Sequence, residues 1–260
     1  MKFFLMSLVS LFFSFSAYSW TLNSASGLRF ANSKVEIKIA SDTCTNAGLT
    51  PSSIDTLVKD SIAQYWATTP TSALELNSTG NSGIAYGNPA NSAAAFAIAP
   101  YNSILVGCTN SAAIFTSSST LAVGAISCTG TNCKGVVLLN DTATTQLNTI
   151  DRDQLLTTFS HELGHALGLG HTSVKEALMY YDLSGKTQKY LHQDDIDAIS
   201  YLYPNEKKLG ALAGSCATVK LIDGDDDHNS GSGPSNFIGS LVIGFMLIVA
   251  LLKIKHTQQR

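Results

Sequence analysis

The chain has 260 residues, with 16 Lys and Arg against 19 Asp and Glu, and a net charge of −3 at pH 7. Charged residues make up only 13% of the chain, about half the roughly 25% of typical soluble domains, and they form no Lys/Arg-rich block. We therefore exclude nucleic acid as a partner, because its binding surfaces need clustered positive charge. Apolar residues spread through the middle of the chain also argue against intrinsic disorder.

Residues 1–19 have the layout of a secretory signal peptide. An early Lys2 precedes an apolar run from Phe3 to Phe15, and the small-residue end Ala17-Tyr18-Ser19 follows. The apolar run is too short for a transmembrane helix. The pattern predicts export, with cleavage after Ser19.

Residues 20–210 are predicted to form one domain. The alternation of Lys34–Ala40 predicts a half-buried strand, and Thr50-Pro51 is typical of a helix start. That helix would bury one face, made of Ile54, Leu57, Val58, Ile62, Tyr65 and Trp66.

A long uncharged region follows this helix. Residues 76–133 contain no charged side chain and are rich in small polar residues. We expect short strands and long polar loops there, with apolar runs at Ala94–Ile98, Ile104–Val106 and Leu121–Ile126. Gly135–Asn140 then predicts a further strand.

The five cysteines predict disulfides, because the chain is expected to be exported. Cys128 and Cys133 are separated by a turn-like Thr-Gly-Thr-Asn spacer and are paired first. Cys44 with Cys108 is the second predicted pair, which leaves Cys216 without a partner.

Two further helices are predicted towards the end of the domain. The first begins near Asp151, where Gln154 lies at capping-box spacing. The second begins at Asp194-Asp195, whose charges suit a helix N-terminus, and Pro204 ends it.

Three histidines on and after the first of these helices are the candidate metal ligands. His161 and His165 are one helical turn apart, so both imidazoles project from one face, and Gly168 allows the chain to turn back with His171. Three imidazoles suit Zn²⁺ and leave its fourth position open, as in catalytic rather than structural sites. Glu162 follows a ligand directly and is the candidate general base.

Two less specific interpretations of these residues are the alternatives. The histidines can be core residues whose rings bind backbone carbonyls, or they can hold zinc only for structure. Neither interpretation requires Glu162 beside the ligands, and half of the six histidines lie in this short segment.

The motif from His161 to His171, followed by Ala177-Leu178-Met179-Tyr180, resembles the metzincin metalloproteases. Within that group the chain is most similar to the matrixins, because Thr172-Ser173 and the segment Gln193–Tyr203 follow the motif. The likeness is sharp over residues 151–204 and loose over 28–140. It implies that Met179 forms an apolar floor under the zinc, although an ordinary core methionine is the alternative.

Tyr181 departs from the matrixin pattern, which usually has Pro at this position. Its spacing from Met179 matches the extra tyrosine ligand of astacins and serralysins, so it is either a metal or oxyanion contact or part of the wall of the substrate pocket. The structural zinc and calcium loops of matrixins are not recognisable in the sequence.

The resemblance implies an α+β catalytic domain. Its twisted, mostly parallel sheet would carry two long helices, and a small C-terminal part would carry the third. It also implies a monomeric zinc endopeptidase that binds a protein or peptide substrate along the edge strand of the sheet. Glu162 would take a proton from the attacking water.

The C-terminal residues predict a membrane segment. Residues 211–236 read as a linker, residues 237–252 form a 16-residue run without a charge, and the basic end 253–260 would stay cytoplasmic. The layout resembles bacterial sorting tails, which implies a bacterial protein at the cell surface or outside the cell. A retained anchor and a processed tail are both consistent with this pattern.

Two other classes of function remain as alternatives. One is an adhesion module that uses zinc only for structure. The other is a membrane-tethered structural protein whose binding surface is residues 76–133.

Overall fold

The computed structural model describes residues 19–205. The C-terminal segment 237–252 and nearly all of the predicted signal peptide lie outside this described part. The main sheet has five strands, in the spatial order β3 (Glu75–Asn81), β2 (Lys34–Ile39), β4 (Ser103–Thr109), β6 (Asn132–Asn140) and β5 (Ala122–Thr129).

The main sheet is mostly parallel, as predicted. Strand β2 pairs in parallel with β3 and β4, and β4 pairs in parallel with β6. Strand β5 is the exception, because it forms an antiparallel hairpin with β6 and so becomes one edge strand of this sheet, with β3 at the opposite edge. Together with the helices, this confirms the predicted α+β architecture.

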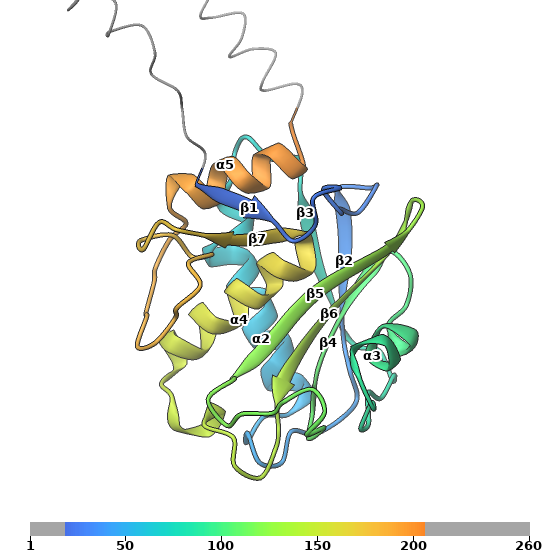
Figure 1. The fold of residues 1–260 in the computed structure, drawn as a ribbon. Helices are drawn as coiled ribbons and strands as arrows, with labels where there is room; N and C mark the ends of the chain where they lie inside the picture. The colour runs from blue at the N-terminus through green and yellow to red at the C-terminus, as the bar shows by residue number, and fades with distance from the viewer. Residues whose placement is uncertain (1–18, 206–260) are drawn as a thin grey trace, which may run out of the picture. The chain divides into compact units, whose positions relative to one another are not determined.

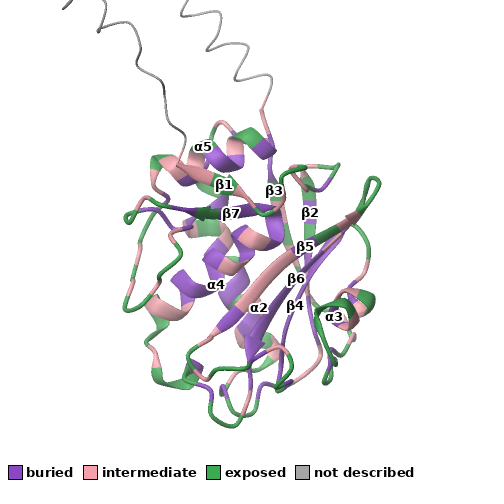
Figure 2. Ribbon diagram, in the orientation of Figure 1, coloured by how far each residue is buried: buried purple, intermediate pink, exposed green. Residues whose placement is uncertain are grey.

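Helices cover both faces of the sheet (Figure 1). The two long helices, α2 (Pro51–Gln64) and α4 (Arg152–Leu167), share a buried core with one face, and α3 (Ser92–Ile98) packs on the other. Strand β4 lies between the two layers and all seven of its residues are buried (Figure 2). Burying a large aliphatic side chain is worth about 1.5–3 kcal/mol, so this central strand anchors the fold.

The start of α2 agrees with the sequence prediction. The Thr50 hydroxyl accepts a hydrogen bond from the backbone N–H of Ser53 at 3.2 Å, and the Ser53 hydroxyl accepts one from the Thr50 N–H at 2.8 Å. This reciprocal pair satisfies two backbone donors that a helix leaves free at its start. A 3₁₀ turn, η1 (Trp66–Thr68), follows the helix.

The expectation of strands and loops throughout residues 76–133 was wrong at one place. Ala94–Ile98 belongs to the helix α3 and not to a strand. The side chain of Asn91 accepts a hydrogen bond from the Ala94 N–H at 2.9 Å, and the alanines that follow have the highest helix propensity. A helix cap and local propensity therefore outweigh the apolar run. The strands expected at Ile104–Val106 and Leu121–Ile126 are present in β4 and β5.

The C-terminal part of the described chain carries the third predicted helix, α5 (Gln193–Leu202). Before it, β7 (Leu169–Thr172) pairs with β1 (Trp20–Leu22) in a separate two-stranded sheet that the sequence did not predict. A second 3₁₀ turn, η2 (Leu147–Thr149), precedes α4.

Both predicted disulfides are present, between Cys128 and Cys133 and between Cys44 and Cys108. Cys216 lies outside the described residues. Among residues 19–205, the structure has no helix that is long and apolar enough to cross a membrane.

Candidate metal centre

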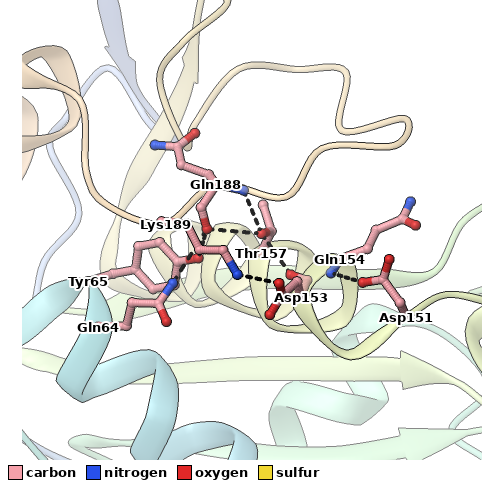
Figure 3. Close-up of polar contacts among 8 residues, drawn as sticks. All are labelled: Gln64, Tyr65, Asp151, Asp153, Gln154, Thr157, Gln188 and Lys189. Atoms are coloured by element: carbon pink, nitrogen blue, oxygen red, sulfur yellow. Dashed lines mark hydrogen bonds and ion pairs between the residues drawn. The ribbon is translucent and has the colours of Figure 1, made fainter.

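The helix α4 holds two of the three candidate ligands. It begins after Asp151, whose carboxylate accepts a hydrogen bond from the Gln154 N–H at 2.8 Å (Figure 3). It ends at Gly168, whose φ of 109° is a conformation that a side chain would strain. The helix start and the glycine turn were both predicted. As a result, His161 and His165 lie on one face and the chain reverses into β7, which carries His171.

The structure brings the three predicted histidines together. Their ligand atoms all lie within 4.8 Å of one another. The Nε2 atoms of His161 and His165 are 3.0 Å apart, and those of His165 and His171 are 3.2 Å apart.

Two of the imidazoles are oriented by backbone carbonyls. The Nδ1 of His161 donates to the Leu178 carbonyl and the Nδ1 of His165 donates to the Leu169 carbonyl, each at 2.8 Å. A carbonyl oxygen only accepts, so each Nδ1 carries the proton and each Nε2 presents a lone pair. Such carbonyl partners are usual for metal-binding histidines.

Burial keeps these imidazoles neutral. It lowers the pKa of His161 to about 3, aided by the neighbouring charge of His165, and it lowers the pKa of His165 to about 4. Burial also lowers the pKa of His171. At neutral pH all three rings can therefore act as metal ligands, since only the neutral ring has a free lone pair.

This set of donors fits a zinc ion. Three nitrogens at about 2.0–2.1 Å from a tetrahedral centre would be about 3.3–3.4 Å apart, close to the two distances between Nε2 atoms given above. Lone pairs converging in this way repel one another unless a cation lies between them.

Glu162 follows His161 on α4 and lines one cleft together with His161 and His171. Its carboxylate accepts a hydrogen bond from the backbone N–H of Gly124 in the edge strand β5. Burial raises the pKa of Glu162 to about 8, and the Gly124 hydrogen bond acts in the opposite direction. A divalent cation at the histidines would favour the carboxylate form.

The turn that follows β7 packs against α4, the helix that carries His161 and His165. Met179 is buried, and a Cβ placed on Gly164 of α4 would lie 2.5 Å from its sulfur atom. The carboxylate of Asp195, at the start of α5, accepts hydrogen bonds from the N–H groups of Leu178 and Met179 at 2.7 and 2.9 Å. Helix α5 thus fixes the turn whose Leu178 carbonyl orients His161.

His161 and His171 open into a cleft of about 490 Å³. One side is formed by Leu121 and by Ala122, the first residue of β5, and the other by residues 181–185. Tyr181 lines this cleft, with 65% of its surface exposed. Its position in the wall agrees with one of the two predicted roles, and a contact with metal or oxyanion stays a prediction. A larger cavity, of about 670 Å³, lies near Phe30 and Glu75 and contains none of these residues.

The far wall of the cleft belongs to a loop, residues 181–190, which we call the cleft loop. The Lys186 ammonium donates to the Lys175 carbonyl at 3.0 Å and also to the carbonyl of Ala177. This cation therefore fastens the middle of the cleft loop to the turn before Met179. The sequence gave no signal for this role, because an isolated lysine is usually solvated.

The end of the cleft loop is fastened to the two long helices (Figure 3). The Gln188 carbonyl accepts hydrogen bonds from the buried Tyr65 hydroxyl and from the Gln64 side chain, and the Gln188 N–H donates to the Thr157 hydroxyl at 3.1 Å. Lys189 forms an ion pair with Asp153. These contacts join residues distant in sequence, so the sequence alone could not predict them.

We expect Tyr65→Phe to loosen the cleft loop without unfolding the protein. The change removes one hydrogen bond from the Gln188 carbonyl, typically worth about 1 kcal/mol of the free energy of unfolding. Urea unfolding and amide hydrogen exchange of residues 186–190 would measure the effect. Tyr101→Phe, at a 61% exposed tyrosine, is the matched control, and equal exchange in both variants would contradict the role of Tyr65.

Comparison with known proteins finds a family model that covers the site. A family model described as matrixin matches residues 109–204, more than a third of the chain. This segment includes β5, β6, α4, β7 and α5, and so all three histidines and Glu162. The resemblance inferred from the sequence is confirmed for this segment.

Individual metalloproteinases are similar to this chain over parts of its length. Metalloendoproteinase 1-MMP of Arabidopsis thaliana is 42% identical over 95 residues, which cover 35% of this chain and 25% of that protein. Matrix metalloproteinase-9 of Canis lupus familiaris is 54% identical over 44 residues, 17% of this chain and 6% of that protein. Metalloendoproteinase 1 of Glycine max is also 54% identical over 44 residues, 16% of this chain and 14% of that protein. The chain thus spans a quarter or less of the length of these relatives.

Proposed function

We propose that the protein is a zinc-dependent endopeptidase in which His161, His165 and His171 hold the metal. The observation that carries this proposal is the convergence of three neutral imidazoles beside Glu162, in a cleft bordered by the edge strand of the sheet. The matrixin match over the same segment and the names of the relatives support it.

Zinc at this site would supply a Lewis acid for the scissile carbonyl and would lower the pKa of a bound water to about 7. Glu162 then accepts a proton from the attacking water and passes it to the leaving amine as the C–N bond breaks. The carboxylate, which accepts a hydrogen bond from the Gly124 N–H, lines the cleft.

The edge strand β5 is the proposed docking strand for an extended peptide. It pairs on one side with β6, and within residues 19–205 no strand pairs with its other side. A peptide that adds to its free side would gain backbone hydrogen bonds and would pass the cleft that contains Glu162.

The proposal predicts metal-dependent proteolysis. Zymography on mixed protein substrates should show cleavage that a chelator abolishes and added zinc restores. A His165→Ala variant should contain far less than one zinc per chain, because removing one of three ligands collapses the site. Full zinc occupancy in that variant would contradict the ligand set. Zinc binding without any cleavage would instead favour an adhesion module.

The alternative function as a binding surface at residues 76–133 has less support. This segment contains most of β3, all of α3, β4 and β5, and the start of β6, and β4 is the buried centre of the sheet. The segment therefore supplies strands to the main sheet and is not a separate layer.

We also propose that the protein is exported and that residues 237–252 associate it with a membrane, as a bacterial anchor or sorting tail. The uncharged run and the basic residues after it support this proposal. A protein ending at Asp227 should stay in the soluble fraction with full activity, whereas the full chain should sediment with membranes. Sedimentation of the shortened protein with membranes would contradict the role of the tail.

A further inference from the structure

The short strand β1 lies against the strand that carries the third histidine (Figure 1). Trp20 pairs with Thr172 and Leu22 with Leu169, in antiparallel register. Between these pairs, the Thr21 hydroxyl donates to the His171 carbonyl at 2.6 Å. The backbone of His171 is therefore held by a residue that precedes it by 150 positions.

The residue after β1 holds the end of α4 in the same way. The Asn23 N–H donates to the Gly168 carbonyl at 3.0 Å, and the Asn23 side-chain amide donates to the His165 carbonyl at 3.3 Å. The last carbonyls of a helix have few partners within the helix, so the Asn23 N–H satisfies the Gly168 carbonyl. The His165 carbonyl accepts from the Gly168 N–H at 3.0 Å, and the Asn23 amide is its second donor. Residues 21–23 thus contact the backbone of two of the three proposed ligands.

Gly170 gives an independent indication that β1 belongs to the site. The positive φ of Gly168 explains why a glycine is found there. Gly170 is not among the glycines with positive φ, so its backbone conformation does not require a glycine. A Cβ at Gly170 would collide with the Thr21 hydroxyl and lie 2.8 Å from the Leu22 carbonyl carbon. The missing side chain at Gly170 therefore makes room for β1.

His171 depends on its backbone more than the other two histidines do. Among the described residues, the rings of His161 and His165 have carbonyl partners at Nδ1, whereas no such partner is found for His171. Its strand is held on one side by β1 and on the other by the Thr172 N–H, which donates to the Met179 carbonyl at 3.0 Å.

We propose that residues 20–23 are a positioning element of the metal centre, which raises its affinity for zinc by fixing the strand that carries His171. This inference rests on the proposed ligand set but does not require that the protein cleave peptides. Ser19, the predicted cleavage position, donates to the carboxylate of Asp194 in α5, and the Trp20 ring lies 5.0 Å from that of Tyr201. The positioning element thus begins where the export signal is expected to end.

The proposal is tested by measuring zinc affinity in the full chain. Thr21→Val removes the hydroxyl that contacts His171 and keeps the side-chain shape, and Gly170→Ala displaces β1 without altering a ligand. Thr21→Ser, which keeps the hydroxyl, is the matched control. Competition with a chromophoric chelator should show about 10–100-fold weaker zinc binding in the first two variants, as is typical when a partner of a ligand is lost. The control should bind zinc like the wild type.

A purely structural role for β1 would give a different pattern. Thermal unfolding with excess chelator would then shift in the variants while the zinc affinity of the folded protein stayed at the wild-type value, and that result would overturn the proposal. If Gly170→Ala does not fold, Thr21→Val against Thr21→Ser decides alone. Zinc binding by the wild type without proteolysis would contradict the proposed function and leave this inference intact.

Discussion

Glu162→Gln should lower kcat/KM on a peptide substrate by about 10²–10⁴-fold, the usual contribution of a general base. The carboxamide is nearly the same size as the carboxylate and can still occupy the cleft beside Gly124. It cannot take a proton from water, however, so the fold and the metal site should remain while the chemical step fails.

The measurement needs zinc content and activity on the same sample. Glu176→Gln is the matched control, because Glu176 is an exposed glutamate in the turn before Met179. One zinc per chain with wild-type turnover in Glu162→Gln would remove Glu162 from the mechanism. Loss of zinc together with activity would mean that the substitution disrupts metal binding, so that the lost activity would not report on proton transfer.

Local sequence signals were enough to predict the parts of the site that lie on one helix and its turn. His161 and His165 follow from helical spacing, and Gly168 follows from the backbone conformation of the turn. The Cys128–Cys133 disulfide was also predicted, because a short spacer leaves few other arrangements. In each case the interacting residues are close in sequence, where spacing alone fixes geometry.

Contacts between distant segments could not be predicted from spacing. Strand β1 has only three residues, too few for an alternating pattern, and its partner lies near the other end of the domain. The anchoring of the cleft loop by Tyr65 and Lys186 depends in the same way on how the helices pack. Helix α3 was missed for another reason, since a short apolar run is compatible with either a strand or a helix.

Gly124 is the clearest example of a residue that only packing explains. It lies within a predicted strand, where glycine is usually unfavourable. In the structure β5 crosses α4 so closely that a Cβ on Gly124 would overlap the backbone carbonyl of Glu162. The same residue donates its N–H to the Glu162 carboxylate. The absence of a side chain therefore sets the distance between the edge strand and the proposed general base.

Gly124→Ala should consequently reduce both stability and activity. Overpacking of a close contact typically costs about 1–3 kcal/mol in the free energy of unfolding. Relief of the overlap must move β5 away from α4, and a displacement of about 1 Å at a catalytic group can cost about 10²-fold in rate. Urea unfolding and kcat/KM should be measured beside Ser127→Ala, which alters an exposed residue of the same strand. Wild-type stability and activity in Gly124→Ala would show that the close approach of β5 to α4 does not position Glu162.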